Sequence, residues 1–148
     1  MKAKLKWKDQ MVFEGVVDGH RITMDAKAPF GKNMGPSPKE LVALGMGGCT
    51  AMDVISLLHK NKQLPQTFEI EVEVDILPTE GKQPAVFSQA LLSFIVTGNI
   101  EPASLVEAVY LSQSKYCGVS AMLSKSFPIS YRIELNGAEV GAGKARFS

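Results

Sequence analysis

The chain has 148 residues, of which 45% are hydrophobic and 21% are charged. This length and this balance are typical of one globular domain with a hydrophobic core, and they exclude a disordered or fibrous chain. The formal net charge of +1 gives no overall field that would attract nucleic acid or an anionic membrane, so we expect neither as a partner. Two cysteines are too few for a disulfide-rich secreted scaffold.

The N-terminal residues alternate lysine with apolar side chains and lack the apolar segment of a signal peptide. No uninterrupted apolar run approaches the roughly 20 residues that cross a bilayer. The sequence therefore predicts a soluble cytoplasmic protein whose cysteines are free, metal-bound or redox-active. We expect no metal, because zinc ligands cluster at short spacing and these cysteines and histidines are far apart in the sequence.

The first predicted elements are three strands. Residues 2–8 alternate lysine with Ala3, Leu5 and Trp7, which predicts a half-buried strand with an outer lysine face. Residues 11–17 and 20–24 predict two more strands, joined at a tight Asp18-Gly19 turn. A loop over residues 25–35, rich in Ala, Pro and Gly, follows this meander.

A long helix is predicted to begin at Ser37, which is a favourable N-cap, is followed by Pro38 and has Glu40 in place to close a capping box. Apolar and small residues then recur at spacings of three and four as far as His59, which predicts a largely buried helix of about seven turns. Three glycines interrupt it, namely Gly45, Gly47 and Gly48. Each costs roughly 1 kcal/mol relative to alanine, so we expect a close neighbour or a bend there.

The rest of the chain predicts strands at residues 68–76, 86–97 and 129–135, with helices at 102–111 and 115–125 between the last two strands. Apolar and acidic residues alternate strictly in the first of these strands, and its acidic face would suit the lysine face of the N-terminal strand. This grouping of elements predicts an α+β domain spanning residues 1–148 with largely antiparallel pairing.

Cys49 and Cys117 each fall within a predicted apolar helix. Free cysteine is among the most buried residue types, so core packing explains both as well as chemistry does. Glycines before Cys49 and small residues around Cys117 leave space for a substrate or for helix packing. A reactive thiolate needs a nearby cation or a helix N-terminus, and Cys49 lies well inside its helix. The candidate cations are Arg21, Lys32, Lys39 and Lys115.

Two carboxylates are candidates to affect the Cys49 thiol. Asp53 follows it by one helical turn and would raise the thiol pKa, which argues against high reactivity. Glu40 precedes it by nine residues, or roughly 13 Å along a straight helix. Glu40 therefore reaches a site at Cys49 only between two chains or across a bend, and capping of its own helix is an equally good role.

Two motifs resemble the OsmC/Ohr family of osmotically inducible and organic hydroperoxide resistance proteins. GPSPKEL at residues 35–41, followed by GMGGCTAMDV at 45–54, is similar to the first cysteine helix of that family, and SKYCGVS at 114–120 is similar to the second. The form of the first motif is closest to the YhfA-like branch. The resemblance implies an OsmC-like α+β fold in which antiparallel sheets from two subunits wrap two central helices, as an intertwined homodimer.

The same resemblance implies that Cys49 is a peroxidatic thiol that reduces an organic hydroperoxide, that Cys117 resolves its sulfenic acid as a disulfide, and that an external dithiol restores both thiols. No metal, flavin or other cofactor is implied. By the same resemblance, Arg21, the only arginine of the N-terminal strands, and Glu40 would be the catalytic cation and carboxylate. The implied apolar substrate-binding residues are Met46, Met52 and Met122.

One departure from the family pattern leaves alternatives open. Lys39 stands where better-known branches have glutamate, and Glu40 comes one residue later, which rotates the carboxylate by about 100° around the helix. A thiol-dependent hydroperoxide reductase is the first hypothesis. The alternatives are a stress-associated dimer that binds a small molecule with little or no peroxidase activity, for which Lys39 and Asp53 argue, and a structural dimer whose thiols only pack.

Overall fold

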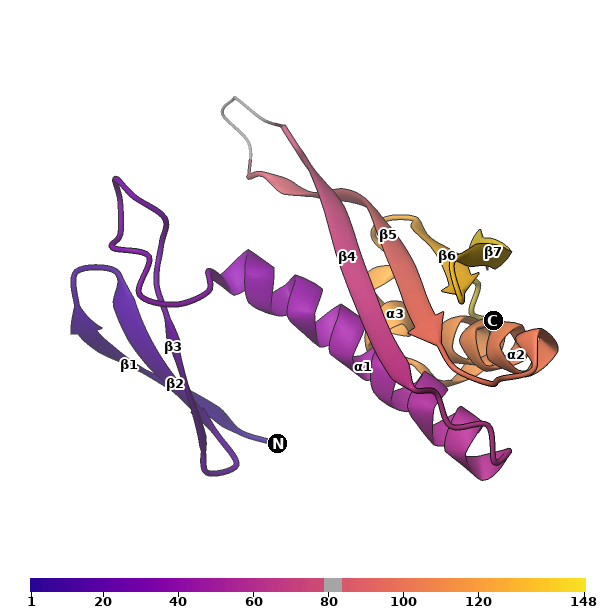
Figure 1. The fold of residues 1–148 in the computed structure, drawn as a ribbon. Coiled ribbons are helices and arrows are strands. Elements are labelled where there is room, and N and C mark those ends of the chain that lie inside the picture. Colours follow the sequence, from indigo (N-terminus) through magenta and orange to yellow (C-terminus); the bar gives the residue numbers. More distant parts are fainter. Residues whose placement is uncertain (79–83) are drawn as a thin grey trace. The chain divides into compact units, whose positions relative to one another are not determined.

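The computed structural model describes residues 1–78 and 84–148, and Figure 1 shows the order of their elements. They form an N-terminal unit, Met1–Ala43, and a C-terminal unit, Leu44–Ser148. Helix α1 (Pro38–Lys60) begins in the first unit and continues in the second.

The N-terminal unit contains a three-stranded antiparallel sheet in the order β1 (Ala3–Asp9), β2 (Val12–Val17) and β3 (His20–Met24). The predicted meander is confirmed. The prediction of a half-buried first strand is wrong for this unit, because Leu5 is 57% and Trp7 63% exposed. A sheet needs a second layer to bury its apolar side, and the described core cluster contains no residue of this unit.

Asp25 anchors the loop that follows β3. Its buried carboxylate accepts hydrogen bonds from the backbone N–H groups of Ala26 at 2.7 Å and of Lys32 and Met34 at 3.1 Å. Burial alone would raise the Asp25 pKa, but these three N–H groups outweigh it and the pKa is lowered. The loop closes tightly, since a Cβ on Gly35 would lie 2.2 Å from the carbonyl oxygen of Thr23.

Asp25→Asn is expected to lower stability at pH 7, where the wild-type carboxylate accepts all three N–H groups. A group with a lowered folded-state pKa stabilises the fold above its unfolded pKa of about 3.9, and this contribution is lost as the pH falls through the folded-state value. Urea unfolding should therefore show a gap between wild type and variant at pH 7 that closes on acidification. Asp9→Asn, at an exposed ion pair with Lys32, is the control and should show little change. A gap that widens in acid would contradict the role of Asp25.

The C-terminal unit contains a four-stranded sheet in the order β4 (Thr67–Leu77), β5 (Val86–Thr97), β6 (Ile129–Leu135) and β7 (Ala138–Lys144). Its outer pairs are antiparallel, as predicted, whereas β5 and β6 are parallel because the chain crosses over through helices between them. Strand β7 was not predicted.

The predicted pairing of the acidic strand with the N-terminal lysine strand stays a prediction, because the two strands belong to different units. In the described part of the chain β4 pairs with β5 alone, and β1 pairs with β2 in the other sheet. The alternation of acidic and apolar residues along β4 has a cause within its own unit. Its apolar side chains, Phe68, Ile70, Val72 and Val74, pack against the core, and the acidic ones face outward.

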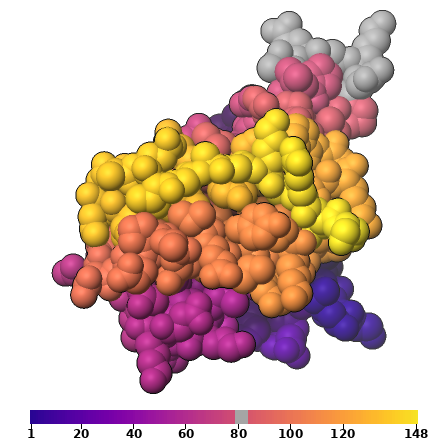
Figure 2. Space-filling view, turned by 90° about the vertical axis from the view of Figure 1, so that its right-hand side faces the viewer, coloured from indigo at the N-terminus to yellow at the C-terminus, as the bar shows by residue number. Residues whose placement is uncertain are grey.

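The helices between β5 and β6 differ from the prediction at one point. Helix α2 (Pro102–Leu111) begins and ends as predicted. The chain then continues as a π-helical segment, η1 (Ser112–Tyr116), becomes extended at Cys117, and forms only the short helix α3 (Gly118–Leu123). The predicted helix over 115–125 is therefore broken at the second cysteine. Figure 2 shows the C-terminal strand and tail beside this helical segment, where Arg146 N–H donates to the Gln113 carbonyl at 2.9 Å.

The core of the C-terminal unit lies between the sheet and the helices α1 and α2, and α1 runs along one face of the sheet (Figure 1). Met46, Val54 and Leu58 of α1 are fully buried there, together with Leu92 and Phe94 of β5. By length and composition alone α1 would also suit a membrane span, but the core helices of soluble proteins pass the same test. The expectation that the protein has no membrane partner stays a prediction.

The structure explains one of the three glycines in α1, Gly47. A Cβ at this position would lie 2.7 Å from Cγ2 of Val72, so the absence of a side chain lets α1 approach β4. This confirms the predicted close neighbour at Gly47, whereas Gly45 and Gly48 have no heavy atom within 4 Å of an added Cβ.

Gly47→Val is expected to lower the free energy of unfolding by about 1–3 kcal/mol, because overpacking forces α1 away from the stiff Val72 side chain. Gly45→Ala is the control, and by helix propensity it should raise stability by up to about 1 kcal/mol. Denaturant unfolding of both variants measures the two effects. A Gly47→Val protein as stable as wild type would show that α1 and β4 do not approach so closely.

Candidate functional site

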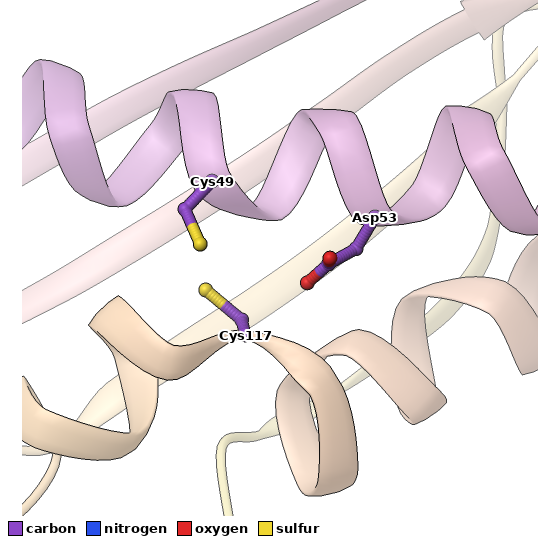
Figure 3. Close-up of side chains that lie close together, drawn as sticks. All are labelled: Cys49, Asp53 and Cys117. Atoms are coloured by element: carbon purple, nitrogen blue, oxygen red, sulfur yellow. The ribbon is translucent and has the colours of Figure 1, made fainter. Parts of the chain in front are cut away.

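The two cysteines come from distant segments and meet in the C-terminal unit. Cys49 projects from the middle of α1, and Cys117 lies opposite at the break between η1 and α3 (Figure 3). The Cys49 sulfur, the Cys117 sulfur and a carboxylate oxygen of Asp53 all lie within 4.8 Å of one another. Both thiols are free, with Cys117 buried and Cys49 partly exposed. Two thiols and one acid therefore share a single site.

The backbone conformation of Cys117 directs its side chain toward α1. With φ −69° and ψ 100° the residue is extended, and it acts as the N-cap of α3. Its Sγ accepts a hydrogen bond from Ser120 N–H at 3.3 Å and lies 3.4 Å from Oγ1 of Thr50. The prediction that Cys117 lies inside a helix is thus wrong, because the π-helical segment ends with Cys117 N–H bonded to the Ser112 carbonyl at 2.9 Å. π-helical turns are rare and often mark functional sites.

Polar side chains fix the surroundings of the cysteine pair. Ser112 Oγ donates to Asp53 Oδ2 at 3.1 Å, and Gln113 Nε2 donates to Thr50 Oγ1 at 3.0 Å. Ser112, Gln113 and Thr50 are all buried. Within the described residues, Gln113 Oε1 and Ser120 Oγ are buried without a hydrogen-bond partner. The sequence did not predict these residues as part of the site. The polar run Ser112-Gln113-Ser114 inside an apolar helical segment was a usable signal for two of them.

The electrostatics of the site favour a protonated Cys49. Burial raises the pKa of the Cys49 thiol, the Val119 N–H lowers it, and Cys117 and the charge of Asp53 raise it further, so that the pKa is raised overall. The predicted direction of the Asp53 effect is confirmed. Among the described residues, no cationic side chain contributes to this shift.

Arg21 and Glu40 both belong to the N-terminal unit. Arg21 is exposed on β3, with Nη1 2.7 Å from Oε1 of Glu14. Glu40 Oε1 lies 2.9 Å from Nζ of Lys27, an interaction that lowers the Glu40 pKa. The predicted capping box is confirmed, because Glu40 Oε2 accepts from Ser37 N–H at 3.3 Å and Ser37 Oγ accepts from Glu40 N–H at 3.4 Å. A role for Arg21 or Glu40 at the cysteine pair stays a prediction.

The three predicted substrate-binding methionines lie in different environments. Met46 is fully buried in the core, which is a packing role. Met52 on α1 is 75% exposed and Met122 on α3 is 64% exposed. Substrate contact by these residues stays a prediction.

Known proteins match this chain over most of its length. The family model described as OsmC-like protein matches residues 31–132. Protein YhfA of Escherichia coli strain K12 is 37% identical over 142 residues, which cover 93% of this chain and 100% of YhfA. The chain therefore belongs to the OsmC family, and the family predicted from its two cysteine motifs is confirmed.

Solved structures of other proteins share the fold. A hypothetical protein from Aquifex aeolicus VF5 is 25% identical, with a TM-score of 0.79 over 91% of this chain and 95% of that chain. An organic hydroperoxide resistance protein OsmC from Legionella pneumophila is 18% identical, with a TM-score of 0.63 over 90% of this chain and 94% of its own. These similarities confirm the predicted OsmC-like α+β fold.

Proposed function

We propose that the protein is a thiol-dependent peroxidase that reduces organic hydroperoxides through Cys49 and Cys117. The observation that carries this proposal is the proximity of the two free sulfurs, which come from segments far apart in a chain with only two cysteines. The fold shared with an organic hydroperoxide resistance protein from Legionella pneumophila supports it.

The proposed cycle begins with attack of the Cys49 thiolate on a peroxide oxygen, because Cys49 is the more exposed of the two thiols. The O–O bond breaks, the leaving alkoxide takes a proton to become an alcohol, and Cys49 becomes a sulfenic acid. Cys117 then attacks the Cys49 sulfur and expels water. The two sulfurs approach to about 2.0 Å as the disulfide forms, and an external dithiol reduces it by thiol exchange.

The proposal requires a cation at Cys49, because the residues around the thiol raise its pKa. We assign this role to Arg21, in a homodimer that brings Arg21 and Glu40 to the cysteine pair. Exposed apolar side chains suit such a dimer, since Leu44 and Met52 of α1 and Trp7 of β1 are all more than half exposed. We place the protein in the cytoplasm, where thiols stay reduced.

A second candidate function is a stress-associated dimer that binds a small molecule with little peroxidase activity. The raised Cys49 pKa and the adjacent Asp53 favour it, because a protonated thiol is a poor nucleophile.

Steady-state consumption of tert-butyl hydroperoxide with dithiothreitol as the reductant separates the two candidates. The peroxidase proposal predicts turnover proportional to enzyme concentration, and faster turnover with tert-butyl or cumene hydroperoxide than with hydrogen peroxide. Consumption no faster than that by dithiothreitol alone would reject the peroxidase and favour the binding dimer.

A further inference from the structure

We propose that the reduced site is also a metal site, in which Cys49, Cys117 and Asp53 bind one thiophilic divalent cation such as Zn²⁺. The three ligand atoms already lie within 4.8 Å of one another and come from two segments that face each other across the site (Figure 3). The sequence predicted no metal, because Cys49 and Cys117 are far apart along the chain. In the folded chain their sulfurs are close enough to share one ion.

The donor set suits zinc. Thiolate sulfur binds Zn²⁺ at about 2.3 Å and carboxylate oxygen at about 2.0–2.2 Å, so a tetrahedral site needs sulfurs roughly 3.7 Å apart. The present separation of at most 4.8 Å exceeds this value by no more than about 1 Å. Three protein ligands leave one coordination position for water, and the partly exposed Cys49 and Asp53 lie on the more open side of the site.

The ligands are held in place by groups outside the site. Ser112 Oγ donates to Asp53 Oδ2 at 3.1 Å, and Ser120 N–H donates to Cys117 Sγ at 3.3 Å. Such outer hydrogen bonds orient metal ligands and strengthen binding. A divalent cation would also neutralise the charge of two thiolates and a carboxylate gathered in one site.

Metal binding and disulfide formation exclude each other, because the metal binds thiolates and the disulfide contains none. When an organic hydroperoxide oxidises the metal-bound pair, two thiolates, one hydroperoxide and two protons yield one disulfide, one alcohol, one water and the released cation. The cation would thus hold the thiols reduced until peroxide arrives. Binding itself needs no peroxide, so the inference can fail or stand independently of the proposed peroxidase.

Cobalt titration tests the proposal. Reduced, chelator-stripped protein is titrated without oxygen, and Co²⁺ serves as a spectroscopic substitute for Zn²⁺. We expect saturation at one Co²⁺ per chain, with thiolate-to-cobalt absorption in the near ultraviolet and visible bands of tetrahedral cobalt, and loss of both when Zn²⁺ is added. The oxidised disulfide protein should bind no Co²⁺.

Two variants show whether Asp53 is a ligand. Asp53→Asn should weaken Co²⁺ binding at least about tenfold, whereas Glu69→Gln, which removes one exposed negative charge from β4, should not change it. Equally tight binding by Asp53→Asn would show that the thiols alone bind the metal and would overturn the proposed site. A wild-type spectrum without thiolate-to-cobalt absorption would overturn it whether or not the variants fold.

Discussion

Cys49→Ser is expected to lower the rate of organic hydroperoxide reduction by at least about a thousandfold, the scale of loss when a catalytic nucleophile is removed. Serine has nearly the same shape as cysteine, but its hydroxyl does not form the thiolate that attacks the peroxide oxygen. Stopped-flow measurement of peroxide reduction by the prereduced protein gives this rate directly. The structural alternative, in which both thiols only pack, predicts an unchanged rate.

Cys117→Ser provides the matched control. The variant retains Cys49, so it should still consume one equivalent of peroxide and accumulate a sulfenic acid, which dimedone traps. It should not recycle through an internal disulfide. Thermal unfolding of both variants shows whether a loss of activity reflects a loss of fold, because Cys117 also caps α3. Loss of the first turnover in folded Cys117→Ser, with Cys49→Ser still active, would reverse the two assigned roles.

Asp53→Asn is expected to speed thiol chemistry while it weakens metal binding. The negative charge of Asp53 raises the pKa of the nearby Cys49 thiol, so its removal lowers that pKa and increases the thiolate fraction at neutral pH. We expect iodoacetamide alkylation of Cys49 at pH 7 to become severalfold faster, and its pH profile to move toward lower pH. The experiment uses Cys117→Ser as background and a chelator to exclude metals.

The direction in which the alkylation rate of Cys49 changes shows which role Asp53 has. If Asp53 instead accepts the proton of the Cys49 thiol, Asp53→Asn will slow both alkylation and peroxide reduction. Glu69→Gln, at an exposed position on β4 that is not among the groups acting on the Cys49 pKa, controls for the loss of one negative charge. An unchanged alkylation profile in Asp53→Asn would mean that Asp53 does not act on the Cys49 sulfur.

Local patterns were enough to predict most of the fold. Ser37 and Glu40 form the predicted capping box, because such a motif depends only on residues within one helical turn. Strand β7 was missed since Ala138–Lys144 has few strong strand formers, yet Asn136 and Gly137 before it both have positive φ, as a hairpin turn requires. That dipeptide was the available signal.

Burial was harder to predict than secondary structure. Alternation along β1 shows which side of the strand is apolar, but it contains no information on whether another element covers that side. Within the N-terminal unit no element covers that side, so Leu5 and Trp7 are exposed. The pattern of one strand also does not identify its neighbour, so the acidic alternation in β4 did not predict its pairing with β5.

The site was predicted in part. The cysteine motifs identified both thiols, and helical spacing placed Asp53 beside Cys49, as the structure shows. Spacing along the chain did not show that Cys117 would join them, because that contact depends on the extended backbone after η1. The supporting hydrogen bonds of Ser112 and Gln113 depend on the same irregular segment.

The central claim is that peroxide joins Cys49 to Cys117, and one measurement tests it most directly. Reduced protein receives one equivalent of cumene hydroperoxide, the free thiols are titrated, and the peptides are mapped by mass spectrometry without reduction. The account predicts that both thiols disappear and that a single Cys49–Cys117 disulfide forms within one chain. An unchanged thiol titre after stoichiometric peroxide, or a disulfide only between chains, would contradict it.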